Sequence, residues 1–101
     1  MTDFATAIDR LHNEVRHWQP ARWSAGAAAS SRADLVYALV QHLADLAAAA
    51  ERRDRRPVPR ELDLVLPDQL LVMSDDLMAA APAASVLAEA TTAVIRTRQA
   101  W

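Results

Sequence analysis

The sequence predicts an all-α protein: a small antiparallel four-helix bundle that forms one domain over residues 1–101. Three observations lead to this prediction. Large apolar residues recur at helical spacings in four segments, alanine is abundant, and the chain has a single glycine. Alanine has the highest helix propensity, and glycine is the residue that most readily adopts the positive φ angles of sharp turns. A chain of 101 residues has the length of one domain with a modest core.

The first helix is predicted over about residues 3–18. Five large residues recur at steps of four and three, which places them on one helical face: Phe4, Ile8, Leu11, Val15 and Trp18. Thr2 is the expected N-cap, and Pro20 ends the helix because the residue before a proline is displaced from the α region. Residues 19–30 then form a connector of small residues, in which a short helical turn is allowed at Ala27–Ala29.

The longest predicted helix spans about residues 31–55. Its apolar residues cover an arc of roughly 140° at the helical step of about 100° per residue, so this helix is expected to contact more than one neighbour. The residues of the arc are Leu35, Val36, Leu39, Val40, Leu43, Leu46, Ala47 and Ala50. Ser31 and Asp34 resemble a capping box at its start. Pro57 and Pro59 end it, since neither can donate the backbone hydrogen bond of a helix.

An extended linker is predicted at residues 57–66. Leucine occurs there at every second position, and these side chains are expected to lie along the bundle: Leu62, Leu64 and Leu66. A third helix is predicted at 67–81 and a fourth at 83–100, with Pro82 between them. The tight corner at Pro82 predicts that these two helices are neighbours. The last helix has a seam with a seven-residue repeat, formed by Leu87, Val94 and Trp101.

Composition restricts the classes of partner and compartment. Eleven basic residues nearly balance thirteen acidic ones, and a formal charge of −2 provides no general attraction to nucleic acid or to anionic membranes. All the basic residues are arginine, which together with the alanine excess suggests a bacterial origin. The absence of cysteine excludes a disulfide framework and a thiolate nucleophile. Without a signal-peptide pattern or an apolar run of about 20 residues, the expected location is the cytoplasm, with no membrane partner.

Two sets of residues suggest a small-molecule site. Trp18, Trp23 and Trp101 are expected at helix ends, where they line a pocket or, more simply, cap the core. His12 and His42 lie beside the apolar stripes of their helices and provide polar groups for such a pocket. If they met between the first two long helices, metal ions would stabilise the protein; local packing of each ring is the favoured alternative.

No catalytic, metal or cofactor site is predicted. Glu14 and His17 have the Glu-x-x-His spacing of di-iron helical bundles, but the second pair is missing, so a solvated face is favoured. A single glycine also excludes a glycine-rich phosphate loop and a nucleophile elbow. The protein is therefore expected not to be an enzyme.

One basic cluster provides a weak nucleic-acid hypothesis. It consists of Arg52, Arg53, Arg55 and Arg56. Because Glu51 and Asp54 interrupt it, a solvated helix end that complements the helix dipole is favoured, and nucleic acid is a disfavoured partner.

The remaining feature is an excess of apolar helix surface. Val72 and Ala79 fall on the acidic face of the third helix, and Ile95 lies away from the seam of the fourth. Such residues indicate a partner that completes their burial. The sequence therefore predicts a non-enzymatic protein-protein interaction module, with a homodimer or another helical protein as partner. A small-molecule-binding bundle is the first alternative, and a nucleic-acid accessory factor is the second.

Overall fold

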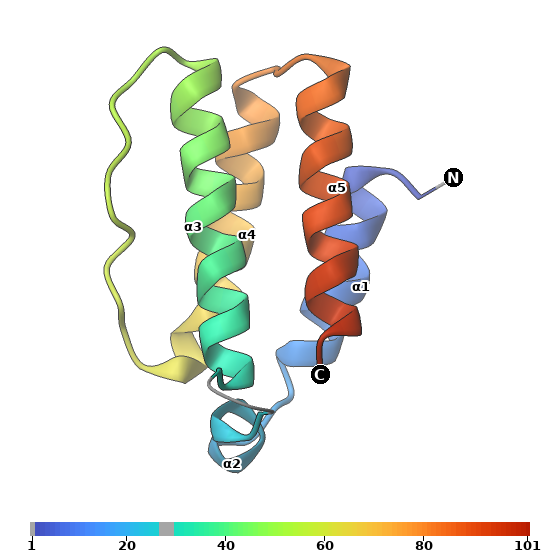
Figure 1. The fold of residues 1–101 in the computed structure, drawn as a ribbon, viewed down its shortest axis with the longest axis vertical. Coiled ribbons are helices and arrows are strands. Elements are labelled where there is room, and N and C mark those ends of the chain that lie inside the picture. The colour runs from blue at the N-terminus through green and yellow to red at the C-terminus, as the bar shows by residue number, and fades with distance from the viewer. Residues whose placement is uncertain (1, 27–29) are drawn as a thin grey trace.

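The computed structural model describes residues 2–26 and 30–101, and within these ranges the chain is helical with no β-strand. The elements are α1 (Phe4–Val15), α2 (Pro20–Ser24), α3 (Arg32–Ala50), the 3-10 turn η1 (Asp63–Val65), α4 (Leu66–Ala79) and α5 (Ala84–Gln99) (Figure 1). The predicted all-α class is confirmed. None of the helices described has the length and apolar character that crossing a membrane requires.

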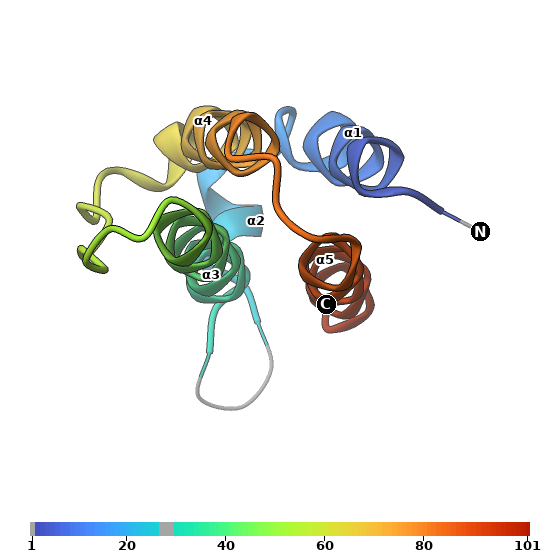
Figure 2. The same ribbon diagram turned by 90° about the horizontal axis from the view of Figure 1, so that it is seen from above.

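The four longer helices occupy the corners of a square when the molecule is seen end-on (Figure 2). In this arrangement α3 and α1 each pack against both α4 and α5. The helices α4 and α5 lie at diagonal corners, so the prediction that the last two helices are neighbours is wrong. Their connection crosses the middle of the bundle beside the end of α3 (Figure 2), where Ala49, Ala50, Ala81 and Pro82 line one cavity. Small residues at this crossing let the loop span the diagonal.

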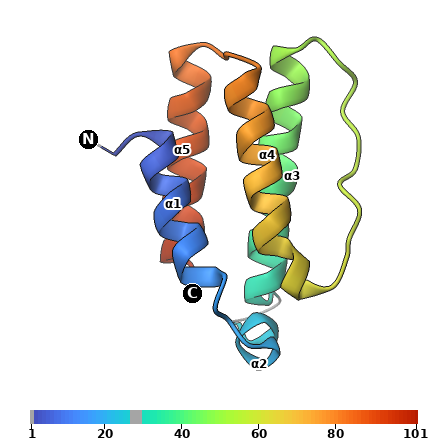
Figure 3. The ribbon, with the colours of Figure 1, turned by 180° about the vertical axis from the view of Figure 1, so that it is seen from behind.

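The helix directions also differ from the predicted antiparallel order. The linker after α3 returns along the full length of that helix, so α4 starts beside the N-terminal end of α3 and runs parallel to it (Figures 1 and 3). Three contacts fix this return path: Gln41 with Arg56, Tyr37 with Val58, and Asp34 with Arg60. A long crossover of this kind is what allows adjacent parallel helices in a bundle.

The core contains the stripe predicted for the first helix. All five of its residues are buried, and so are the central apolar residues of α3 and α4: Val36, Leu39, Val40, Leu43, Leu66, Leu70 and Leu77. Full burial of one such side chain contributes about 1.5–3 kcal/mol. On the apolar arc predicted for α3, Leu35 and Leu46 are only partly buried, and Ala50 is exposed.

Two of the three leucines predicted to lie along the bundle, Leu62 and Leu64, do not pack against it, while Leu66 is buried. Leu62 and Leu64 are 79% and 58% exposed, whereas Val58 is 5% exposed. The linker is anchored at Val58 by hydrogen bonds to its backbone, and this anchor sets which side chain enters the core. The turn η1 then directs Leu64 outward and Leu66 inward.

Two helices end earlier than predicted for identifiable reasons. Helix α1 stops at Val15, because the chain must already be extended at Gln19, before Pro20. Helix α3 stops at Ala50 in place of residue 55, through a C-terminal motif in which Arg52 adopts a positive φ of 57°.

The other boundaries differ from prediction by one or two residues. Helix α4 starts at Leu66 and ends at Ala79, and α5 covers Ala84–Gln99. A short helix does form in the first connector, but at Pro20–Ser24. The turn predicted at Ala27–Ala29 lies outside the described residues.

Candidate functional site

The three tryptophans gather at one end of the bundle, as the sequence suggested. The Trp18 ring lies at the centre, with ring centroids 4.9 Å from Trp23 and 4.8 Å from Trp101, both in edge-to-face geometry. Trp18 and Trp23 are buried and Trp101 is partly covered. These separations are those of packed aromatic pairs, so the rings fill the space between the helix ends, and Trp101 alone faces an adjoining cavity.

Polar groups hold this aromatic cluster in place. The indole of Trp101 donates to Glu14 at 3.1 Å, and Arg98 donates to the other carboxylate oxygen of Glu14 at 2.9 Å. The guanidinium carbons of Arg22 and Arg32 lie 5.2 and 5.9 Å from the Trp18 ring centroid, within cation–π range. Glu14 therefore links α1 to the end of α5, and it does not pair with His17.

The two predicted ligand histidines are not brought together. His12 is on α1 and His42 is on α3, and these helices occupy opposite corners of the square (Figure 2). The idea of a shared histidine site is therefore wrong. His42 instead faces α5, where its Nε2 lies 3.4 Å from a carboxylate oxygen of Glu89. In the described part of the chain, no group of three or more residues is placed to hold a metal ion.

A groove runs between α3 and α5. It consists of two adjoining cavities of about 410 and 290 Å³ that share Leu35 and Ala100. Hereafter the term α3–α5 groove denotes these two cavities. Its lining is mainly short or apolar: Ala25, Gly26, Leu35, Ala38, Leu39, Ala93 and Ala100. The short alanine side chains on the facing helices leave the hollow.

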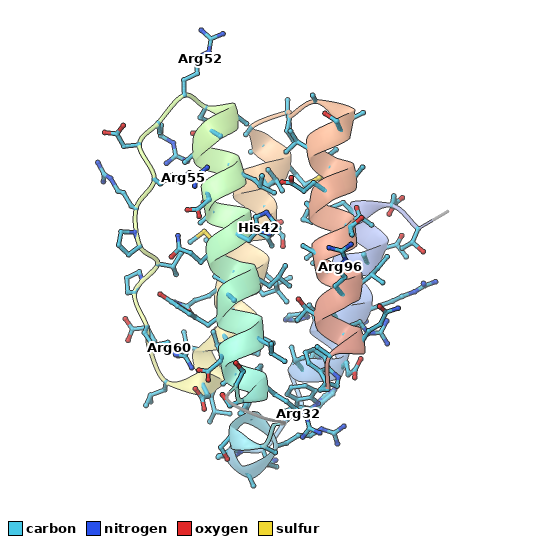
Figure 4. All side chains as sticks on the ribbon, viewed as in Figure 1. Arg32, His42, Arg52, Arg55, Arg60 and Arg96 are labelled. Atoms are coloured by element: carbon cyan, nitrogen blue, oxygen red, sulfur yellow. The ribbon has the colours of Figure 1, made fainter. Side chains whose placement is uncertain are left out.

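Arginine side chains on both helices border the α3–α5 groove. Arg32 and Trp101 lie at one end, and His42 and Arg96 lie toward the other. Figure 4 shows His42 on α3 and Arg96 on α5 at similar heights on either side of the groove. Among the described residues Arg96 makes no ion pair, and the buried Nε of Arg32 has no hydrogen-bond partner. The groove thus combines an apolar floor with a positive border.

The opposite side of the molecule is acidic. The exposed stripe of α4, hereafter the α4 face, consists of Asp68, Val72, Asp75 and Ala79, and it follows helical spacing. Val72 is 52% exposed. The helix itself contains no basic residue, so the charged side chains of the α4 face are all negative.

The predicted interface residues fall on two separate surfaces. Val72 and Ala79 are exposed on α4, as expected for that helix. Ile95 is 39% exposed and lines a different groove, of about 360 Å³, between α1 and α5. The charges at that groove include the Glu14–Arg98 ion pair, which neutralises part of its border.

The arginine cluster is divided between a helix end and the linker: Arg52 and Arg53 form the C-terminal motif of α3, and Arg55 and Arg56 follow in the linker. Arg52 extends beyond the bundle and Arg55 lies on the side of α3 away from the α3–α5 groove (Figure 4). Arg53 pairs with Glu51 at 2.7 Å, and Arg53 and Arg56 border a small cavity that also contains Asp76. The four arginines therefore do not form one continuous basic surface.

Two carboxylates have shifted pKa values, and both are helix caps. A hydrogen bond from the Thr6 backbone N–H lowers the pKa of Asp3, and one from the Ser31 backbone N–H lowers the pKa of Asp34. The predicted capping box of Ser31 and Asp34 is present, while the N-cap of α1 is Asp3 in place of Thr2. Both groups are exposed at helix N-termini, where the shifts indicate a structural role.

Sequence reasoning missed the α3–α5 groove and Arg96. The signal available was the series of alanines on facing helices, Ala38 on one and Ala93 and Ala100 on the other. That pattern acquires meaning only when α3 and α5 are known to be adjacent.

Comparisons of the chain with protein-family models, with curated proteins and with solved structures found no match.

Proposed function

We propose that this protein is a non-enzymatic interaction module whose α3–α5 groove binds an amphipathic helix carrying acidic residues. The observation that supports this proposal is the combination of an apolar floor, at Leu35 and Leu39, with an arginine on each flanking helix: Arg32 on α3 and Arg96 on α5. Binding of an amphipathic helix in such a groove is a recurrent mode of peptide recognition.

The dimensions of the groove suit a short helix. Its lining extends from Arg32 to His42 along α3, which corresponds to about 15 Å at the helical rise of about 1.5 Å per residue. That length matches two to three turns of a partner helix. The alanines of the groove allow a partner backbone to approach closely, and Leu35 is already partly exposed to receive it.

The charges favour an acidic partner. Arg96 makes no ion pair among the described residues, and His42 faces only one carboxylate, that of Glu89. A basic helix would place like charges against Arg96 and Arg32, which is unfavourable, whereas an acidic helix would pair with them. Charge at the border contributes mainly to specificity and association rate, and the apolar floor contributes most of the affinity.

A pair of synthetic peptides tests the proposal. Both are helical, about four turns long, with leucines at helical spacing; one has glutamates on the flanks and the other has arginines. Tryptophan fluorescence reports binding because Trp101 lines the groove. We expect the acidic peptide to bind at least about tenfold more tightly, equal to about 1.4 kcal/mol. Equal binding of both peptides, or binding of neither, would contradict the proposal.

Matched variants locate the binding surface. Ala38→Glu introduces a like charge for the acidic peptide within the groove, while Ala88→Glu makes the same change on an exposed position of α5 outside it. Both positions are exposed and helical, so both variants are expected to fold. We expect Ala38→Glu to weaken binding of the acidic peptide at least tenfold (about 1.4 kcal/mol) and Ala88→Glu to leave it unchanged.

A further inference from the structure

The proposed function leaves the partner of the groove unidentified, and the molecule itself has a surface that fits. Resting on that function, we propose that the occupant is the α4 face of a second copy of this chain. Each copy would then insert its α4 face into the α3–α5 groove of the next, in a head-to-tail arrangement.

Charge complementarity is the first argument. The α4 face carries Asp68 and Asp75 on a helix without basic residues, and the groove is bordered by Arg32 and Arg96. Apolar contact accompanies the charges, because Val72 lies between the two aspartates on the same stripe and the groove floor is apolar. The two surfaces are therefore complementary in charge and in apolar contact, the two properties that determine recognition.

Spacing is the second argument. Asp68 and Asp75 are seven residues apart on α4, a separation of about 10 Å along the helix axis. On α3, Leu35 and His42 delimit the second cavity and are also seven residues apart, again about 10 Å. The whole α4 face, from Asp68 to Ala79, is about 16 Å long, close to the 15 Å or so of the groove.

The placement of the two surfaces determines the symmetry. The two helices that line the groove, α3 and α5, lie at the front in Figures 1 and 4, whereas α4 lies at the front in Figure 3, which shows the molecule from behind. Because the surfaces are on opposite sides, a copy that fills the groove of one neighbour keeps its own groove open for another. Such heterologous contacts propagate into chains or rings.

A two-fold dimer is disfavoured by the same charges. Pairing two α4 faces across a two-fold axis would bring the aspartates of one copy close to those of the other. Pairing two grooves would bring Arg32 and Arg96 of one copy close to the same two arginines of the other. Like charges in contact oppose association, so the head-to-tail arrangement is the one that the charge distribution supports.

Complementation between two variants tests the proposal. The groove variant, Ala38→Glu with Arg96→Glu, keeps an intact α4 face; the face variant, Val72→Arg with Asp75→Arg, keeps an intact groove. The substituted residues are all exposed, and circular dichroism verifies that both variants fold. In sedimentation velocity, we expect the wild-type mass to rise with concentration beyond that of a dimer. Each variant alone should be a monomer, because like charges then face each other, and mixing the two should restore association, because the acidic face of the groove variant meets the intact groove of the face variant.

Other outcomes overturn this proposal. A wild-type protein that stays monomeric at the highest accessible concentration, or whose mass stops at that of a dimer, would do so, as would a mixture of the two variants that does not associate. A restored complex that is insensitive to salt would also contradict it, because the exposed charge pairs are screened at high ionic strength. If the acidic peptide binds a wild-type protein that stays monomeric, the proposed function stands and this inference fails. If neither peptide binding nor self-association occurs, both fail.

Discussion

The hydroxyl of Tyr37 donates a hydrogen bond to the backbone carbonyl of Val58, and Gln41, one turn further along α3, accepts the Val58 N–H at 2.7 Å. Gln41 also donates to the carbonyl of Arg56 at 3.0 Å. Both backbone groups of Val58 are thus satisfied by side chains of one helix while its own side chain enters the core. This clip holds the linker along α3 and brings α4 to its parallel position.

Removing the clip is expected to destabilise the fold. Gln41→Ala leaves the Val58 N–H without its partner, and the loss of one such hydrogen bond costs about 1–3 kcal/mol when the group cannot reach water. Urea denaturation measures the change, and trypsin cleavage within the linker should become faster. Gln69→Ala is the control: it loses only an exposed contact to Pro59, so its effect should stay within about 0.5 kcal/mol.

Glycine is expected to stabilise the chain at two positions. Arg52 and Ala81 have φ angles of 57° and 47°, in the left-handed region after α3 and α4. At the end of α3, the N–H of Arg52 donates to Ala49 and that of Arg53 donates to Ala48, which is the hydrogen-bond pattern of a Schellman motif. A residue with a Cβ atom in this conformation is strained by about 1–2 kcal/mol, and glycine removes that strain. Glycine also gives the unfolded chain more conformational entropy, which cancels part of the gain in stability.

The measurement is a set of three single variants. Arg52→Gly and Ala81→Gly should each raise the free energy of unfolding by about 0.5–1 kcal/mol. Ala80→Gly, next to Ala81 but with a right-handed φ of −71°, should lower it by a similar amount. If all three glycines destabilise the protein, the left-handed assignments at Arg52 and Ala81 are wrong.

The helix caps predict a loss of stability in acid. The pKa values of Asp3 and Asp34 are lowered in the folded state, so their contribution is complete above the ordinary value of 3.8 and disappears as the pH falls through the lower folded-state values. The side-chain oxygen of asparagine accepts the same hydrogen bonds, and its amide group does not change protonation in this pH range. The variant Asp3→Asn with Asp34→Asn should therefore lose less stability than the wild type below pH 3.8.

Urea midpoints at a series of pH values compare the two proteins. The difference between them should change below pH 3.8 and stay constant between pH 5 and 7 (about one unit or more above that value). Parallel curves throughout the acid range would show that these carboxylates do not act as charged caps.

The sequence predicted the helices better than their arrangement. The apolar stripe of α1, from Phe4 to Val15, is a local pattern whose burial does not depend on which helix covers it. The path of the linker depends on polar side chains, Tyr37 and Gln41, that have no periodic signature. Once the linker runs back along α3, the order and direction of the last two helices change. Local spacing therefore cannot predict that α4 and α5 are diagonal.

The candidate sites were predictable to different degrees. The tryptophans gather as expected because each lies near a helix end, at the same end of the bundle. The pairing of His12 with His42 failed because it required two helices to be neighbours that the linker path separates. The α3–α5 groove results from short side chains on both helices, among them Ala38 and Ala93, and such a hollow becomes visible only in three dimensions.

The central claim is that the α3–α5 groove is the binding surface, and a residue-level map tests it most directly. Two-dimensional ¹H–¹⁵N NMR spectra of the protein, at a concentration low enough for it to be monomeric, would be recorded while the acidic peptide is added. We expect amide shifts to concentrate at Leu35, Ala38, Ala93 and Thr97, which line the groove, while Asp68 and Val72 on α4 stay unchanged. Shifts along α4 or in the α1–α5 groove, with none at the four lining residues, would contradict the account.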